Sequence, residues 1–303
     1  MQTHLNSPDC KNGHIVRVLI TGKNGQLGWE LVNRAPASVN LTAFSSTELD
    51  ITEPQSIQNA MTRVRPDVVI NTAAYTAVDK AETDSDKAYE VNAQGVINLA
   101  QACKIANVRL LHVSTDFVFD GTKHSPYLTT DTPNPLGVYG ASKLAGEIGV
   151  QSQLPDSVIV RTAWVYSTHG NNFVKTMLRL MQEKAQLGVV SDQIGTPTYA
   201  AGLADWLWAV CQNDSVSGLY HWTDAGVASW YDFAVAIQEL AQEKGLLKKM
   251  IPILPIYAEQ YPTPAKRPPY SVIDKTSAEQ DSGVQTTHWR KQLSIMLDEL
   301  AKP

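Results

Sequence analysis

The stretch Leu19-Ile20-Thr21-Gly22-Lys23-Asn24-Gly25-Gln26-Leu27-Gly28 decides how this chain folds. It joins an apolar, β-branched segment at 16–21 to a segment at 26–33 with the apolar spacing of a helix. Its three glycines recur every third residue, a variant of the commonest dinucleotide-binding spacing. Glycines here let the backbone approach a pyrophosphate, whose charge the helix N-terminus attracts. The stretch therefore predicts a strand-turn-helix unit that binds a dinucleotide.

The same alternation continues through the first half of the chain. Further β-branched segments are expected to be strands at 41–44, 68–71, 109–114 and 158–161. Segments with helical spacing separate them at 54–63, 85–106 and 138–151. Alternation of this kind predicts an α/β fold, a doubly wound parallel sheet of the Rossmann type.

The rhythm changes after residue 165. Helices are expected at 173–183, 199–212 and 230–244, and the proline-rich segment 252–269 should cross the molecule in extended form. We therefore predict an NAD(P)-binding domain over 15–165, to which 199–225 returns. Residues 166–198 and 226–303 should form a smaller C-terminal substrate-binding lobe. Residues 1–14 are polar and aperiodic, which indicates a flexible N-terminal extension.

Composition excludes several classes of function. The net charge of -5, without a block of basic residues, argues against nucleic-acid binding. No apolar run is long enough to span a bilayer, and 1–14 lack the apolar core of a secretory signal, so we expect a cytoplasmic protein without membrane contact. Cys10, Cys103 and Cys211 lie far apart, and no histidine has metal-ligand spacing. We expect Cys103 and Cys211 in the core and no metal ligands.

The cofactor end of the sheet begins at the glycine turn, where the candidate cofactor-binding residues are Gly22, Lys23, Gly25, Gln26, Leu27 and Gly28. After the second strand Ser45 stands where an acid could bind ribose hydroxyls. A carboxylate would repel a 2′-phosphate, so its absence together with Lys23 favours NADPH without excluding NADH. Asp50 and Ile51 form a turn that could meet the adenine, although Asp50 could equally cap the next helix.

Three residues suit the chemistry of a carbonyl. Tyr139 and Lys143 are one helical turn apart and share a helix face. A nearby ammonium lowers the pKa of a phenol, which favours Tyr139 as a proton donor. Thr115 ends the fourth strand, where a hydroxyl can hold a carbonyl oxygen or simply form a turn.

The order of glycine turn, Thr115, Tyr139 and Lys143 resembles the short-chain dehydrogenase/reductase superfamily. Further segments resemble its extended members that act on nucleotide sugars, above all the dTDP-4-dehydrorhamnose reductase family; they lie at 65–71, 77–82, 114–116, 139–147, 161–166, 171–173, 192–198 and 261–268.

This resemblance implies an NAD(P)H-dependent reduction of dTDP-4-dehydro-6-deoxy-L-mannose to dTDP-L-rhamnose, the last step of dTDP-rhamnose biosynthesis. Thr115, Tyr139 and Lys143 would be catalytic, with Lys143 also on the nicotinamide ribose. The resemblance adds cofactor-lining residues Gln26, Leu27, Ala73, Ala74 and Tyr75, and substrate-binding residues Asp116, Trp164 and Asn172.

The sequence allows more than one role for Arg267 and Trp164, and more than one assembly and activity for the chain. The guanidinium of Arg267 suits a diphosphate, and Trp164 could contact the sugar ring or pack between lobe and sheet. A homodimer is possible, and Glu30 could join a Mg²⁺ site at its interface, as acidic residues do in some relatives. Alternatives on the same scaffold are a nucleotide-sugar epimerase, another 4-keto sugar reductase, or a non-catalytic regulatory subunit of the methionine adenosyltransferase type. A dehydratase would need an acid where Phe117 stands.

Overall fold

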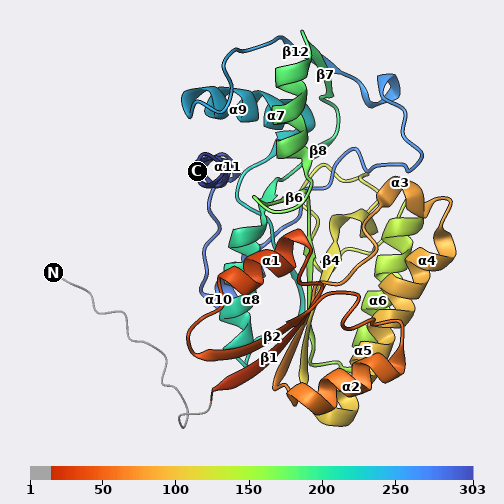
Figure 1. The fold of residues 1–303 in the computed structure, drawn as a ribbon. Helices are drawn as coiled ribbons and strands as arrows, with labels where there is room; N and C mark the ends of the chain where they lie inside the picture. The colour runs from red at the N-terminus through yellow and green to blue at the C-terminus, as the bar shows by residue number, and fades with distance from the viewer. Residues whose placement is uncertain (1–14, 303) are drawn as a thin grey trace.

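The computed structural model describes residues 15–302 and has a six-stranded sheet at its centre. Its order is β10-β5-β4-β3-β1-β2, and each neighbouring pair is parallel (Figure 1). The strands are β1 Val16–Thr21, β2 Val39–Phe44, β3 Val68–Asn71, β4 Arg109–Thr115, β5 Val158–Thr162 and β10 Gly218–His221. The chain order reverses between β1 and β3, which opens a crevice at the carboxyl ends of these strands. The predicted doubly wound sheet is confirmed.

Helices cover both faces of this sheet. One face carries α1 (Gln26–Asn33), α8 (Ala200–Cys211) and α10 (Thr276–Ser282); the other carries α2 (Pro54–Val64), α5 (Val96–Ala106) and α6 (Val138–Gln153). The segment 199–225 supplies α8 and the edge strand β10 of the sheet. In contrast to the predicted division, α10 packs on α8 and β10 rather than in the lobe, and Trp206 Nε1 donates to Ala278 O at 3.2 Å.

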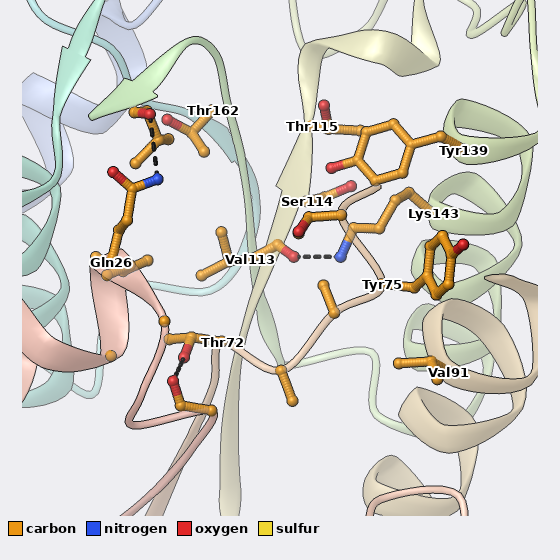
Figure 2. Close-up of a pocket in the computed structure, with 18 of the residues that line it drawn as sticks. Gln26, Thr72, Tyr75, Val91, Val113, Ser114, Thr115, Tyr139, Lys143 and Thr162 are labelled. Atoms are coloured by element: carbon orange, nitrogen blue, oxygen red, sulfur yellow. Dashed lines mark hydrogen bonds between the residues drawn. The ribbon is translucent and has the colours of Figure 1, made fainter. Parts of the chain in front are cut away.

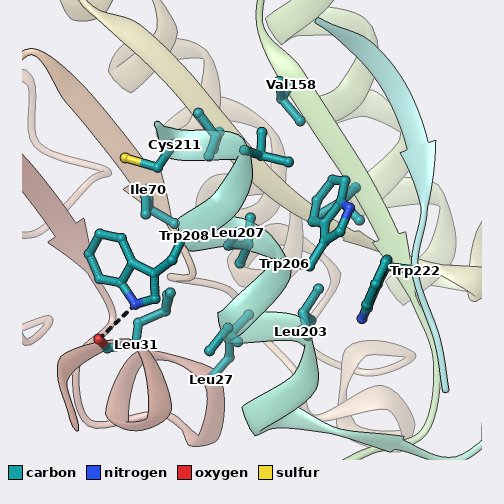
Figure 3. Close-up of a cluster of buried hydrophobic side chains, with 14 of the residues drawn as sticks. Leu27, Leu31, Ile70, Val158, Leu203, Trp206, Leu207, Trp208, Cys211 and Trp222 are labelled. Carbon is teal, nitrogen blue, oxygen red and sulfur yellow. Dashed lines mark hydrogen bonds between the residues drawn. The ribbon is translucent and has the colours of Figure 1, made fainter. Parts of the chain in front are cut away.

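Tryptophans of α8 dominate the core between that helix and the sheet (Figure 3). Trp206 and Trp208 of α8 are buried together with Trp222, which follows β10. Trp208 Nε1 donates to Leu31 O at 3.1 Å, which ties α8 to α1. Cys103 and Cys211 are also buried, and burial raises both thiol pKa values to about 12, so they stay protonated. Cys10 and the rest of 1–14 lie outside the described residues.

Helices of the second half of the chain lie beyond the carboxyl ends of the strands (Figure 1), and their buried side chains form a second apolar cluster. It contains α7 Phe173–Glu183, α9 Trp230–Glu243 and α11 Trp289–Leu300. Short strands pair around it: β6 Val165–Tyr166 with β9 Thr198–Tyr199, β7 Leu187–Val190 with β12 Ile253–Ile256, and β8 Ile194–Gly195 with β11 Ala228–Ser229. Local capping fixes the helix starts: Ser229 and Asp232 form a capping box at α9. Within residues 15–302, no helix is long and apolar enough to cross a membrane.

The helix expected at 85–106 is interrupted. It consists of α4 (Ser85–Tyr89), a π-helical turn (Glu90–Gly95) and α5, and the short α3 (Val78–Ala81) precedes it. Asn92 in the π-helical turn accepts from Tyr75 N at 2.9 Å and donates to Tyr75 O at 3.0 Å. The extra residue in the turn thus serves to aim a buried amide at the loop after β3. Among residues 15–302, short 3-10 turns also occur at Asp116–Val118 and Ala258–Gln260.

Candidate active site

The glycine turn after β1 leaves bare backbone exposed to the crevice. Gly22 has φ +76°, and a Cβ there would lie 2.9 Å from Ala73 N. A Cβ on Gly28 would lie 2.2 Å from Gly22 O, so α1 packs directly on the turn. Neither position accepts a side chain without distortion. This cradle and the start of α1 fit the pyrophosphate of a dinucleotide, which needs close backbone approach and a helix N-terminus.

A cavity of about 860 Å³ runs from this turn across the strand ends to α6 (Figure 2). Most of the predicted cofactor-binding residues line it: Gly22, Gly25, Gln26, Leu27, Gly28, Ser45, Asp50, Ile51, Ala73, Ala74, Tyr75, Tyr139 and Lys143. It lies where the strand order reverses, the usual ligand position in open α/β sheets. Asp50 does not cap α2; its Oδ1 accepts from Thr52 N at 2.9 Å, and the α2 N-cap is Glu53.

Lys23 is the predicted cofactor residue that does not line the cavity. Its Nζ lies 2.7 Å from Glu48 Oε2, and the same oxygen accepts from Ser45 N and Ser45 Oγ, each at 2.8 Å. A carboxylate does lie at the end of β2, because the turn after Ser45 folds Glu48 back to the Ser45 backbone N–H. The Ser-x-x-Glu spacing was a usable signal, since it is typical of a side chain that returns to a backbone N–H.

The three predicted catalytic residues meet at the other end of the cavity (Figure 2). Lys143 donates from Nζ to Val113 O at 2.7 Å, and burial lowers its pKa to about 8. Burial raises the pKa of Tyr139 to about 12, which outweighs a hydrogen bond with Thr115. The predicted lowering of the phenol pKa by Lys143 is not found, because burial dominates and the ammonium faces a carbonyl. Tyr139 thus holds its proton at neutral pH, as a proton donor must.

A buried ion pair connects α6, the helix that carries Tyr139 and Lys143, to the central sheet. Arg161 on β5 lies 2.6 Å from Glu147 on α6, one turn beyond Lys143, and the two side chains are 3% and 2% exposed. Ser114 on β4 also donates to Glu147, and the Arg161 guanidinium lies over the Phe119 ring. The pair joins β4, β5 and α6 beneath the site. Sequence analysis missed it, although a glutamate on the buried face of α6 was a signal that it needs a partner.

Asp116 and Trp164, the predicted sugar contacts, both line the cavity. Burial raises the pKa of Asp116 to about 6, and its Oδ1 accepts from Thr115 Oγ1 at 3.1 Å. Trp164 has φ +48° and stacks on Trp230 with ring centroids 3.5 Å apart. It is therefore both a wall of the cavity and part of the lobe packing.

Asn172 and Arg267 are not among the cavity-lining residues. Asn172 Nδ2 donates to Gln26 Oε1 at 2.9 Å and to Ser167 O at 2.7 Å, and its Oδ1 caps α7. It fastens the loop 167–172 to the start of α1. Arg267 pairs with Asp79, with Nη2 to Oδ2 at 2.9 Å, and so fastens the proline-rich segment to α3.

The expectation of Mg²⁺ at Glu30 is not supported. Glu30 is buried in the chain, accepts from Ser167 Oγ at 2.6 Å and pairs with Arg34 at 3.2 Å. Burial raises the pKa of its carboxyl. No group of three or more His, Cys, Asp or Glu side chains in the described part of the chain is arranged to hold a metal ion.

The fold and cavity define an NAD(P)-dependent extended short-chain dehydrogenase/reductase. The sequence matches the family described as RmlD substrate binding domain over residues 16–302. The chain belongs to the dTDP-4-dehydrorhamnose reductase family, which confirms the resemblance inferred from its motifs.

Individual relatives agree with this assignment. The chain is 43% identical to the dTDP-4-dehydrorhamnose reductase of Aggregatibacter actinomycetemcomitans, over 92% of this chain and 97% of the relative. A solved dTDP-4-dehydrorhamnose reductase from Bacillus anthracis str. Ames, in complex with NADP, is 37% identical with a TM-score of 0.90, covering 94% and 100% of the two chains. One from Clostridium acetobutylicum ATCC 824 is 41% identical with a TM-score of 0.90, covering 95% and 100%.

Proposed function

We propose that this protein reduces the C4 keto group of dTDP-4-dehydro-6-deoxy-L-mannose to give dTDP-L-rhamnose, with NADPH or NADH as reductant, in the cytoplasm. The observation that carries the proposal is the convergence of Thr115, Tyr139 and Lys143 on the cavity that also contains the glycine turn. Membership of the reductase family supports the substrate.

The glycine turn and the start of α1 would hold the cofactor pyrophosphate, with Ala73 and Tyr75 beside it. Asn92 holds the backbone of Tyr75 in place through its two hydrogen bonds. When bound, the reduced nicotinamide supplies a hydride to C4 of the sugar. Lys143 would bind the nicotinamide ribose. To do so, its ammonium would donate to the ribose hydroxyls in place of the Val113 carbonyl.

Tyr139 would donate its phenolic proton to the C4 oxygen, so that hydride and proton together convert the carbonyl to a hydroxyl. Thr115 would hydrogen-bond the same oxygen and draw electron density from it. Burial disfavours the tyrosinate that proton donation leaves behind, so a nearby ammonium is required in the reacting complex. Lys143, which lines the cavity and lies one helical turn from Tyr139, would be that cation. Reprotonation of Tyr139 from solvent would complete the cycle.

The sugar would lie between Tyr139 and the lobe, against Asp116 and the face of Trp164. Asn172 would contribute indirectly, by holding the loop 167–172 on the glycine turn. Arg267 would meet the substrate diphosphate only after release from Asp79; the alternative is that it acts solely as a fastening of the proline-rich segment.

The direct test mixes purified protein with dTDP-4-dehydro-6-deoxy-L-mannose and either NADPH or NADH, follows loss of the reduced nicotinamide, and identifies the sugar product. We expect consumption of reductant equal to the dTDP-L-rhamnose formed. Absence of turnover with both reductants would contradict the proposal and favour a non-catalytic role for this scaffold. Reductant-independent conversion of the sugar would indicate an epimerase instead.

A further inference from the structure

The carboxylate of Glu48 occupies a set of three donors at the end of β2. Its Oε2 accepts from the Ser45 backbone N–H and the Ser45 hydroxyl, each at 2.8 Å, and lies 2.7 Å from Lys23 Nζ. The two Ser45 contacts belong to a local turn, in which Glu48 N donates to Ser45 O at 3.1 Å. The turn does not account for Lys23, which approaches from the glycine turn.

These donors lie at the adenosine end of the cavity. Ser45 and Ser46 line it beside Leu49, Asp50 and Ile51. Lys23 and Glu48 are not among the lining residues, and Glu48 reaches this end through its hydrogen bonds to Ser45. The glycine turn is fixed to this strand end, because Lys23 N donates to Phe44 O at 3.0 Å. In doubly wound folds the end of this strand faces the adenosine ribose, where an acid accepts from a 2′-hydroxyl and a cation meets a 2′-phosphate.

An ammonium, a hydroxyl and a backbone N–H together form a set of donors suited to an anion. In this protein the anion is its own Glu48. Lys23 and the Ser45 donors lower the pKa of Glu48 to about 2, so it stays a carboxylate at any pH near neutrality. Its side chain is 47% exposed, and it can therefore rotate into water without burying a charge.

We propose that Glu48 sets the nicotinamide cofactor preference by competing, as an internal anion, for the donors that a ribose 2′-phosphate needs. This rests on the proposed use of NADPH or NADH. With NADH the carboxylate stays and accepts from a ribose hydroxyl. With NADPH it turns away, and Lys23 and Ser45 donate to the phosphate.

The test measures dissociation constants of NADP⁺ and NAD⁺ by calorimetry, without the sugar. Glu48→Gln keeps the shape and removes the charge, so NADP⁺ binding should tighten about tenfold relative to NAD⁺, as expected for one charge removed close to a phosphate. Lys23→Met should change the ratio in the opposite direction. The control is Glu53→Gln, an exposed glutamate at the N-cap of α2 that neither lines the cavity nor bonds Ser45; its ratio should equal that of the wild type.

An unchanged NADP⁺ to NAD⁺ ratio in Glu48→Gln, or equal weakening of both ligands, would show that Glu48 only stabilises the local turn and would overturn the proposal. Wild-type protein that binds neither dinucleotide would overturn it too. A protein that binds both and shifts preference as described, yet does not reduce the sugar, would refute the proposed function and leave the role of Glu48 intact.

Discussion

The buried ion pair between Glu147 and Arg161 predicts a large stability effect from a single substitution. Glu147→Gln preserves size but leaves the guanidinium without a counter-charge at a site where both side chains are at most 3% exposed. Breaking a buried pair from one side costs about 3–5 kcal/mol of unfolding free energy. Because total stability is about 5–15 kcal/mol, this is a large fraction of it.

Urea denaturation followed by tryptophan fluorescence and by circular dichroism measures this loss. With a slope of about 3 kcal/mol per molar, the midpoint should fall by about 1–1.7 M. The matched control is Glu183→Gln, which removes the exposed partner of Arg179 in an i, i+4 pair that is 59% and 49% exposed. Exposed pairs of this kind contribute about 0.3–0.5 kcal/mol, so its midpoint should barely move.

Replacing both residues distinguishes two causes of the lost stability, an unpaired buried charge and poorer packing. Glu147→Leu combined with Arg161→Met should be more stable than Glu147→Gln, because apolar residues of similar volume need no counter-charge. Equal midpoints for Glu147→Gln and Glu183→Gln would refute the reasoning, since they would mean that the guanidinium gains no stability from its carboxylate partner.

Three further predictions concern the site. Asn172→Ala removes the hydrogen bond to Gln26 and the cap of α7. It should raise the KM for the cofactor, leave the KM for the sugar unchanged and lower the free energy of unfolding by about 1 kcal/mol. A change in the sugar KM alone would show instead that Asn172 contacts the substrate, as the sequence predicted. Arg267→Met and Asp79→Asn should raise the sugar KM equally if Arg267 only fastens the proline-rich segment; a loss in Arg267→Met alone, measured in the same assay, would assign Arg267 to the diphosphate. Burial lowers the pKa of Lys143 to about 8 and raises that of Tyr139 to about 12. We therefore expect kcat/KM to fall as the pH rises above about 8, because the free enzyme loses the Lys143 ammonium. A pH profile that stays flat to about pH 10, the ordinary pKa of tyrosine, would contradict this.

The fold was accessible from local sequence features. The glycine turn and the β-branched segments around it are determined by residues close in the chain, and β1, β3, α1 and α7 have the predicted bounds. The π-helical turn was not predicted, because it depends on the contact between Asn92 and the loop backbone at Tyr75, 17 residues earlier, which helical spacing does not show. The return of α10 to the sheet likewise depends on Trp206 and Ala278.

The grouping of the candidate catalytic residues could be predicted from the sequence, whereas the partners of other candidate residues could not. Thr115, Tyr139 and Lys143 do line one cavity, because Thr115 ends β4 at the carboxyl edge of the sheet and the first turns of α6 pack against the residues that follow it. What Asn172 and Arg267 bind could not be read from their own positions, since Gln26 and Asp79 come from distant elements. The protonation state of Tyr139 could not be predicted from the sequence either, because burial, rather than the spacing to Lys143, dominates its pKa.

The central claim is that Tyr139 delivers a proton and does not merely bind the cofactor. The most direct measurement compares kcat and the NADP⁺ dissociation constant of Tyr139→Phe with those of the wild type. Tyr220→Phe serves as the control, because Tyr220 does not line the cavity and its hydroxyl donates to Asp281. Loss of a general acid should lower kcat by about 10²–10⁴-fold in Tyr139→Phe only, with NADP⁺ affinity nearly unchanged. A Tyr139→Phe variant with near-normal kcat would contradict the account.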